Sequence, residues 1–180
     1  YSAEVGVLSS AGGDALAVLG YLDQGGNQII QGSLDSGAFD TFVLSDGMIG
    51  DSLTDTFGSD LDNSFGSMPG SLGEGAQMFT KYAEENGVNP SVYVGESYDA
   101  AALIILAMQA GESTDKSSIA ANIMNVANGP GEKIMAGELS KGLKLLADGK
   151  SIDYQGATDV SFTDVGEAFG LFIEKGIENG

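Results

Sequence analysis

The side chains that could do chemistry in this chain are carboxylates and tyrosine hydroxyls, because its 180 residues include no Cys and no His. The lack of Cys removes disulfides, thiolate metal sites and cysteine nucleophiles, and the lack of His removes the commonest general base. Tyr98-Asp99 could be read as a catalytic pair, but its place at a predicted helix start favours capping and packing. We therefore predict no catalytic residue, cofactor or metal site. A hydrolase that uses paired Asp and Glu side chains stays open as a less favoured alternative.

Two polar loops follow the two short apolar runs in the first part of the chain. Residues 15–20 and 41–44 are apolar and bounded by turn residues, which is typical of strands buried on both faces of a parallel sheet. Tyr21 opens the loop after the first run, and Asp46 lies in the loop after the second. Ligands of such sheets bind just beyond the carboxyl ends of the strands, so both loops are candidates. Each residue also has an ordinary explanation, as a half-buried strand end and as an Asp-Gly turn.

The formal charge of the chain is −19, from 26 acidic and 7 basic residues. A surface of this sign repels phosphate backbones and anionic lipids, so we expect no nucleic acid and no anionic membrane as a partner. The simplest interpretation is that the acid excess keeps a secreted or salt-adapted protein in solution. The chain opens with Tyr-Ser-Ala-Glu and shows no signal-peptide pattern, so we expect a processed or trimmed piece of a longer protein.

The hydrophobic pattern predicts an α/β segment, then a mainly helical one, then a return to β structure. Helical patterns cover residues 1–12, 29–37, 50–57, 75–86, 97–109, 116–127 and 138–148. A strand is expected through Phe65 and a last one within 170–177. The early alternation of helices and strands predicts βαβ crossovers and a parallel sheet. Pro69 and Gly70 interrupt both kinds of element and mark the best candidate boundary.

The helix predicted at 97–109 is the most apolar element of the chain. Residues 100–108 include no polar side chain, with Ser97 as the expected N-cap and Gly111 at the C′ position. A helix that is apolar all round is buried on more than one side, and this one is too short to cross a bilayer.

Four passages carry a family resemblance: Tyr1-Ser2-Ala3 with Gly13 to Tyr21, Phe42 to Gly47, Glu96 to Ala101, and Asp153 to Thr158 with Val160, Phe162 and Gly166. In this order they resemble the type I periplasmic solute-binding proteins, the branched-chain amino acid (Leu/Ile/Val-type) receptors of ABC transporters. The chain departs from the family at Asp159, where Gly is usual, and in its shorter length.

The resemblance implies an α/β fold with two Rossmann-like lobes, of which this chain would supply the C-terminal half. Residues 1–66 would belong to the second lobe, 73–153 to the helical part of the first lobe, and 159–180 would return to the second lobe as a β segment. The chain would cross between the lobes at 67–72 and 154–158. The implied hinge residues are Ser67, Met68, Pro69, Gly70, Gln155 and Gly156.

The resemblance also implies a site. In amino-acid-binding members, a Tyr and an acidic residue in these two loops hold the α-ammonium group of the ligand, which implies Tyr21 and Asp46, with Leu22 near the ligand side chain. A desolvated ammonium needs a paired carboxylate and a ring face. The implied function is a periplasmic receptor that delivers a small amino acid-type ligand to an ABC permease. A sensor of the same fold that controls a regulator is the alternative.

In this interpretation the apolar helix packs on a sheet that lies mostly before Tyr1 in the family. The helix face formed by Leu103, Ile104 and Ala107 would then be exposed as an apolar patch. We therefore expect the fragment to self-associate, or to pair with the missing N-terminal half.

Overall fold

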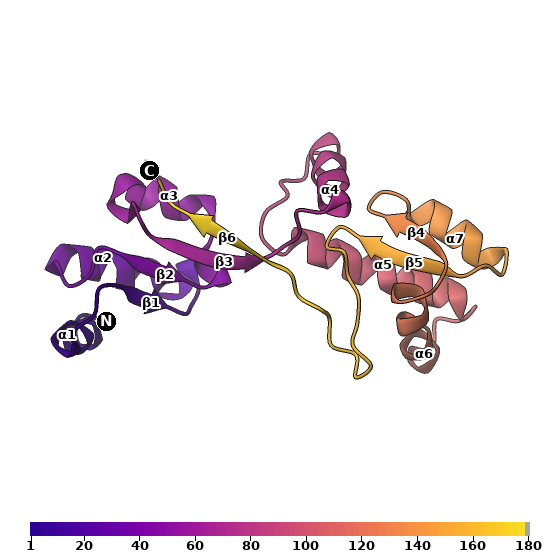
Figure 1. Ribbon diagram of the computed structural model, residues 1–180, viewed down its shortest axis with the longest axis horizontal. Coiled ribbons are helices and arrows are strands. Elements are labelled where there is room, and N and C mark those ends of the chain that lie inside the picture. The colour runs from indigo at the N-terminus through magenta and orange to yellow at the C-terminus, as the bar shows by residue number, and fades with distance from the viewer. Residues whose placement is uncertain (179–180) are drawn as a thin grey trace. The chain divides into compact units, whose positions relative to one another are not determined.

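The computed structural model describes residues 1–178, and the chain forms two compact units (Figure 1). Unit 1 comprises Tyr1–Pro69 and the segment that starts at Phe172, and unit 2 comprises Gly70–Leu171. Among the described residues, no helix combines the length and the apolar character needed to cross a membrane.

Unit 1 is built on a four-stranded sheet in the order β1-β2-β3-β6. The first three strands are parallel, and β6 pairs antiparallel with β3. Its elements are α1 (Ser2–Ala11), β1 (Leu16–Val18), α2 (Gly26–Ser36), β2 (Phe42–Leu44), α3 (Asp51–Phe57), β3 (Phe65–Pro69) and β6 (Phe172–Gly176), with 3₁₀ turns at Leu22–Gln24, Asp46–Met48 and Gly58–Leu61. The expected α/β class and parallel sheet are confirmed.

The core of unit 1 lies on one face of this sheet. Leu16 and Val18 of β1 and Phe42 and Leu44 of β2 are buried there with side chains of α2 and α3. The strands are three residues long, so their alternation buries the first and third side chains and leaves Ala17 exposed. Parallel strands of this kind need helical crossovers, which α2 and α3 supply.

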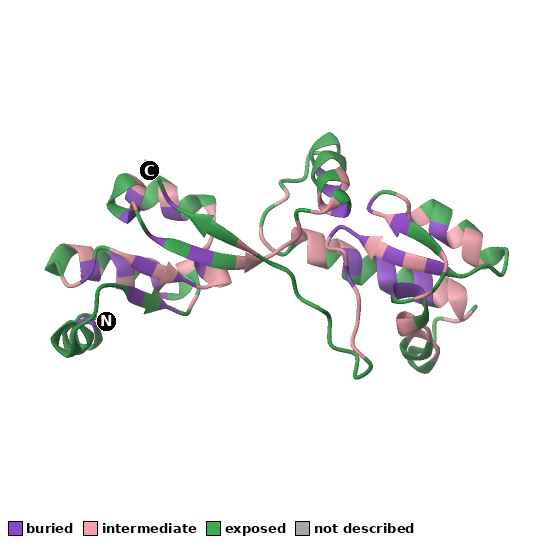
Figure 2. Cartoon of the chain, in the orientation of Figure 1, coloured by how far each residue is buried: buried purple, intermediate pink, exposed green. Residues whose placement is uncertain are grey.

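Unit 2 combines four helices with a pair of parallel strands. Its elements are α4 (Glu74–Glu85), α5 (Val94–Ala110), α6 (Lys116–Ala127), β4 (Glu132–Met135), α7 (Leu139–Ala147) and β5 (Ile152–Gly156). The core joins buried residues of α5, α6, β4 and β5, and Figure 2 shows these purple segments gathered on α5 and β5. The apolar helix predicted from the sequence is therefore a core element of unit 2.

Residues 73–153 are mainly helical, as expected, but two strands of unit 2, β4 and β5, were not predicted. Strand β4 buries a single side chain, that of Ile134, between charged and partly exposed neighbours, and its sequence shows no apolar run. Strand β5 alternates buried Ile152 and Tyr154 with polar residues, a pattern too short to separate from a connection.

The start of α5 also differs from the prediction. The helix begins at Val94 after Tyr93, which has a φ of 67°, so Ser97 lies inside the helix and is not its N-cap. Leu103 and Ala107 are buried within unit 2, and the predicted exposed patch is wrong for both. Ile104 is exposed, at 41%, and so is its neighbour Ile105, at 40%, so part of α5 does present apolar side chains to solvent.

The two units meet at two points in the sequence. The first coincides with a predicted crossing between lobes, and the second does not. Unit 1 gives way to unit 2 at Pro69–Gly70, within residues 67–72, with Ser67 and Met68 inside strand β3. The second change falls at Leu171–Phe172, whereas residues 154–158, including Gln155 and Gly156, lie inside unit 2. Residues 159–171 also stay in unit 2, and only the segment from Phe172 returns to the sheet of unit 1. The role of these segments as hinges stays a prediction.

The carboxylate of Asp99 on α5, together with the pairing of β5 with β4, holds residues 154–158 in unit 2. It is 2% exposed and accepts hydrogen bonds from the Tyr154 hydroxyl (2.8 Å), the Ala157 amide (2.8 Å), and the Thr158 amide (2.9 Å) and hydroxyl (2.7 Å). Burial raises the pKa of Asp99, and these hydrogen bonds oppose the shift. Burial and the Asp99 carboxylate raise the pKa of Tyr154, so its hydroxyl stays protonated and donates. The buried carboxylate thus fixes the turn after β5 to helix α5.

Asp159, where the resemblance implies Gly, is the next residue of the same turn. Its φ of 54° falls in the left-handed region that Gly adopts readily and that Asp tolerates better than most residues. Its carboxylate accepts a hydrogen bond from the Ser71 hydroxyl, which gives the side chain a structural role.

We expect Asp99→Asn to lower the free energy of unfolding by about 3 kcal/mol, because an amide nitrogen in place of one carboxylate oxygen leaves buried donors of Ala157 or Thr158 without an acceptor. Chemical denaturation followed by circular dichroism measures the change. Glu96→Gln is the matched control on the same helix, since no hydrogen bond joins Glu96 to the turn, and it should change stability by less than about 0.5 kcal/mol. Equal effects of the two substitutions would contradict the assigned role of Asp99.

Candidate ligand-binding site

The parallel pairing of β1 with β2 brings the two candidate loops to the same edge of the unit 1 sheet. Val18 is in register with Leu44, so Tyr21 and Asp46 follow neighbouring strand ends. Ser45 joins these ends: its amide donates to the Val18 carbonyl (3.2 Å), and its hydroxyl lies 3.2 Å from the Gly20 amide and 3.3 Å from the Gly20 carbonyl. The relative placement of the two loops is therefore fixed by hydrogen bonds.

Tyr21 presents its ring to solvent at this edge, with 57% of the residue exposed. Its carbonyl accepts from the amides of Gln24 (3.2 Å) and Gly26 (3.0 Å), which closes the tight turn into α2. Gly25 gives this turn a φ of 107°, a left-handed conformation that suits Gly. The backbone of Tyr21 is thus held while its ring stays accessible, as a ligand-facing residue requires.

Asp46 opens the 3₁₀ turn Asp46–Met48 and is partly exposed. Its Oδ1 accepts from the Gly47 amide at 2.9 Å, so the residue does have the turn role expected of an Asp-Gly pair. This hydrogen bond fixes the Asp46 side chain in the turn after β2, at the edge where ligands of parallel sheets bind.

Gly47 follows Asp46 in the chain and packs against the ring of Tyr21. A Cβ atom at this position would overlap the Gly20 carbonyl oxygen and would come within 2.7 Å of Cδ1 of the Tyr21 ring. Only a residue without a side chain lets the Asp46 turn lie directly against that ring. The structure therefore brings the loops of Tyr21 and Asp46 together, and a contact of either residue with a ligand stays a prediction.

Leu22, the third predicted contact, is placed differently. It lies in the 3₁₀ turn Leu22–Gln24, is partly buried, and packs on the hydrophobic core of unit 1. Its position supports the turn that carries Tyr21. A contact between Leu22 and a ligand stays a prediction.

The charge of unit 1 restricts what this edge can bind. The range Tyr1–Pro69 contains ten Asp and Glu residues and no Lys or Arg, and the returning segment adds Lys175 together with Glu174 and Glu178. The potential around Asp46 is therefore negative, which favours cationic ligands and disfavours anions. Residues 1–178 contain no group of three Asp or Glu side chains arranged to hold a metal ion.

Sequence reasoning missed the residues that position this site, namely Ser45, Gly47 and Gly26. Their signal was present, since Ser-Asp-Gly directly follows an apolar run and Gly25-Gly26 precedes a helix. The sequence does not predict which backbone atoms these glycines approach. A Cβ at Gly26, for example, would lie 2.7 Å from the Tyr21 carbonyl oxygen, a contact that arises from the fold.

We expect Gly47→Ala to lower the free energy of unfolding by about 1–3 kcal/mol, because the added methyl group overpacks a close backbone approach. It should also shift the ring resonances of Tyr21 in the NMR spectrum. Gly20→Ala is the control, since a Cβ at Gly20 has no heavy atom within 4 Å, and it should leave both measurements nearly unchanged. Identical behaviour of the two variants would show that Gly47 does not support the ring.

Known proteins share the fold of this chain but little of its sequence. The chain matches no known protein-family profile and no curated protein by sequence. It superposes on the leucine-binding protein LivK of Thermotoga maritima with a TM-score of 0.70 and 18% identity, covering 99% of this chain and 45% of that one. A type 1 periplasmic binding protein of Bordetella pertussis Tohama I matches with a TM-score of 0.60 and 22% identity, over 71% of this chain and 39% of that one. The chain thus spans less than half of each structure, and the likeness confirms an α/β fold of the type I periplasmic binding-protein kind.

Proposed function

We propose that this chain is part of an extracytoplasmic solute receptor and that its unit 1 binds the ammonium group of a small amino acid-type ligand. The observation that carries the proposal is the adjacency of the Tyr21 and Asp46 loops at the carboxyl ends of β1 and β2. Ligands of parallel α/β sheets bind at that edge. The fold supports a binding role, since the two similar structures are a leucine-binding protein and a periplasmic binding protein.

The charge distribution favours the ammonium end of such a ligand over its carboxylate end. Tyr1–Pro69 supplies carboxylates and no basic side chain, and an ammonium ion gains from both a carboxylate and an aromatic face. The ligand carboxylate would be held by hydroxyl and backbone groups of a segment of the longer protein. An ABC permease is the partner that we propose for the loaded receptor, in the periplasm.

Three related probes separate the two ends of the ligand in an NMR titration of this chain. L-Leucine carries both charges, 3-methylbutylamine keeps only the ammonium group, and 4-methylpentanoate keeps only the carboxylate. We expect the two amines to shift the amide signals of Tyr21 and Gly47 with dissociation constants of about 1 mM, a free energy near −4 kcal/mol. The acid should shift neither signal, and a response to it equal to that of leucine would contradict the proposed contact.

Asp46→Asn removes the negative charge and keeps the shape of the side chain. We expect it to weaken binding of 3-methylbutylamine about tenfold, in line with the loss of one charge-assisted contact. Asp35→Asn is the matched control, because it makes the same change in net charge at an exposed position near the C-terminus of α2 and should leave the dissociation constant unchanged. Unchanged binding by the Asp46 variant would remove this residue from the site.

A further inference from the structure

The Asp46-Gly47 sequence belongs to a class that rearranges without an enzyme, because no Cβ atom shields the glycine nitrogen. This nitrogen attacks the side-chain carboxyl carbon, a C–O bond breaks, and one water leaves, which gives a five-membered succinimide ring. Water then opens the ring at either carbonyl, and opening at the main-chain carbonyl gives isoaspartate. The two steps together consume no net water and need no oxidant, reductant or cofactor. Asn-Gly sequences follow the same route with ammonia as the leaving group.

Residues 1–178 contain four Asp-Gly or Asn-Gly pairs, and hydrogen bonds hold three of them away from this reaction. In two pairs the glycine amide ends a helix, since the amides of Gly87 and Gly149 each donate to a carbonyl of the last turn at 3.0 Å. In the third pair the side chain is held at both ends: Asn128 accepts from the Phe162 amide (2.9 Å) and donates to the Phe162 carbonyl (2.7 Å). In these three pairs the ring cannot close without breaking a hydrogen bond.

The fourth pair, Asp46-Gly47, is arranged for the reaction. The Gly47 amide donates to Oδ1 of Asp46 at 2.9 Å, so the attacking nitrogen already lies against the carboxyl group that it would attack. Both residues are partly exposed, which gives water access to the ring, and they lie in a 3₁₀ turn of only three residues. The other three pairs direct the nitrogen or the side chain to a different part of the chain, and this pair directs the two reacting groups to each other.

We infer that Asp46-Gly47 is a site of spontaneous isoaspartate formation, and that this modification inactivates the candidate ligand-binding site. The first half of the inference rests on the turn alone, and the second half rests on the proposed function. Isoaspartate adds one carbon atom to the main chain and leaves its carboxylate directly on Cα. The charge that the ligand ammonium group needs is therefore moved, and Gly47 is displaced from the ring of Tyr21.

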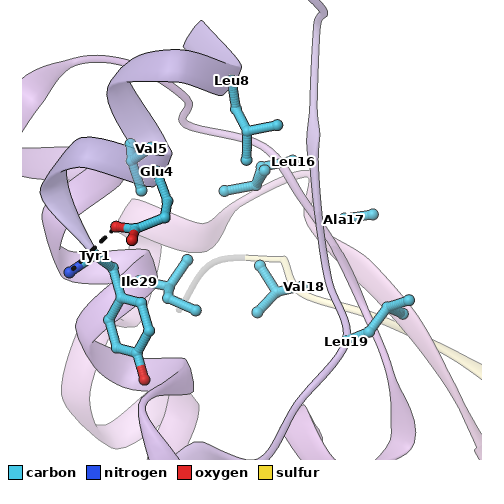
Figure 3. Close-up of a pocket in the computed structure, with 9 residues that line it drawn as sticks. All are labelled: Tyr1, Glu4, Val5, Leu8, Leu16, Ala17, Val18, Leu19 and Ile29. Carbon is cyan, nitrogen blue, oxygen red and sulfur yellow. Dashed lines mark ion pairs between the residues drawn. The ribbon is translucent and has the colours of Figure 1, made fainter.

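The neighbouring strand end is held by packing and cannot move to accommodate a longer turn. Figure 3 shows the side chain of Val18 on β1 pointing into a hollow that Ile29 also lines, and Val18 is 4% exposed. Strand β1 leads directly to Gly20, whose carbonyl oxygen would lie 2.4 Å from a Cβ atom at Gly47. A lengthened turn therefore loses its contact with the tyrosine ring, because the backbone on the other side of that contact is fixed.

Endoproteinase Asp-N cleaves before aspartate and not before isoaspartate, so one digest of the unmodified chain reads every Asp-Gly pair. The chain is stored near neutral pH in water enriched in ¹⁸O, digested in ordinary water and analysed by mass spectrometry. We expect residues 40–50 to accumulate as one uncut peptide that carries ¹⁸O, because ring opening adds an oxygen atom from the solvent. Asp148-Gly149 is the internal control, and its uncut peptide, residues 115–152, should form at least about tenfold more slowly.

The digest can overturn the first half of the inference in three ways. These are equal rates at the two Asp-Gly pairs, an uncut peptide 40–50 without ¹⁸O, and no uncut peptide at all. Asp46→Asn tests the route, since ammonia leaves in place of water and the same isoaspartate peptide should form faster. A variant that forms none would overturn the succinimide route.

3-Methylbutylamine tests the link between the modification and ligand binding. At about ten times its dissociation constant it should slow isoaspartate formation about tenfold, because only the unbound fraction reacts, and 4-methylpentanoate should have no effect. The isoaspartate form, separated by ion exchange, should bind the amine about tenfold more weakly than the unmodified chain. Equal binding by the two forms would overturn the inactivation. An amine that binds neither form would overturn the proposed function and the inactivation together, and the isoaspartate result from the digest would still stand.

Discussion

Parallel pairing of β1 and β2 is the constraint on which the candidate site depends. Two parallel strands need a crossover between them, and α2 supplies it, so both strands end at the same edge. The chain then turns sharply after each strand, at places that are 25 positions apart in the sequence but lie side by side at this edge. Ser45 satisfies the backbone groups of Val18 and Gly20 at this point, and Gly47 allows the second turn to lie against Tyr21. In an antiparallel pair the carboxyl ends of the two strands lie at opposite edges of the sheet. Here the strands are parallel, so the loops that follow them are adjacent.

Unit 2 meets the same constraint with a different solution. The carboxyl end of β5 is also a turn at a sheet edge, but it is buried by α5, where water cannot satisfy the backbone amides. The carboxylate of Asp99 accepts from both amides of Ala157 and Thr158, so an ionisable group replaces solvent. The two strand edges therefore serve different purposes: the edge at Tyr21 is open to solvent, and the edge at Gly156 is closed by a side chain of the most apolar helix.

Local pattern predicted most of the elements but not the contacts between distant residues. Apolar runs and glycine stops located β1, α2, β2 and α6, because these elements carry their own signal in consecutive residues. Strand β4 escaped prediction since one buried Ile134 makes no run, and its strand character comes from pairing with β5. Asp99 looked like a helix-start residue for the same reason, because its partners are more than fifty positions away in the sequence. Local pattern placed the loops of Tyr21 and Asp46 at strand ends and the family resemblance singled out the two residues, whereas Ser45 and Gly47 gain their roles only from the paired strands.

Unit 1 is discontinuous in sequence, because β6 follows unit 2 in the chain. The sheet of unit 1 is therefore completed only after unit 2 has been synthesised. Residues 1–69 leave the ribosome before any of unit 2, yet β3 receives its antiparallel partner only when residues 172–176 have been synthesised. Until then the edge of β3 that pairs with β6 is open, and its backbone groups can associate with other nascent chains. Pairing across so long a stretch of sequence is also slow, since loop closure must precede the contact. Synthesis of β6 therefore ends the period in which unit 1 is most prone to aggregate.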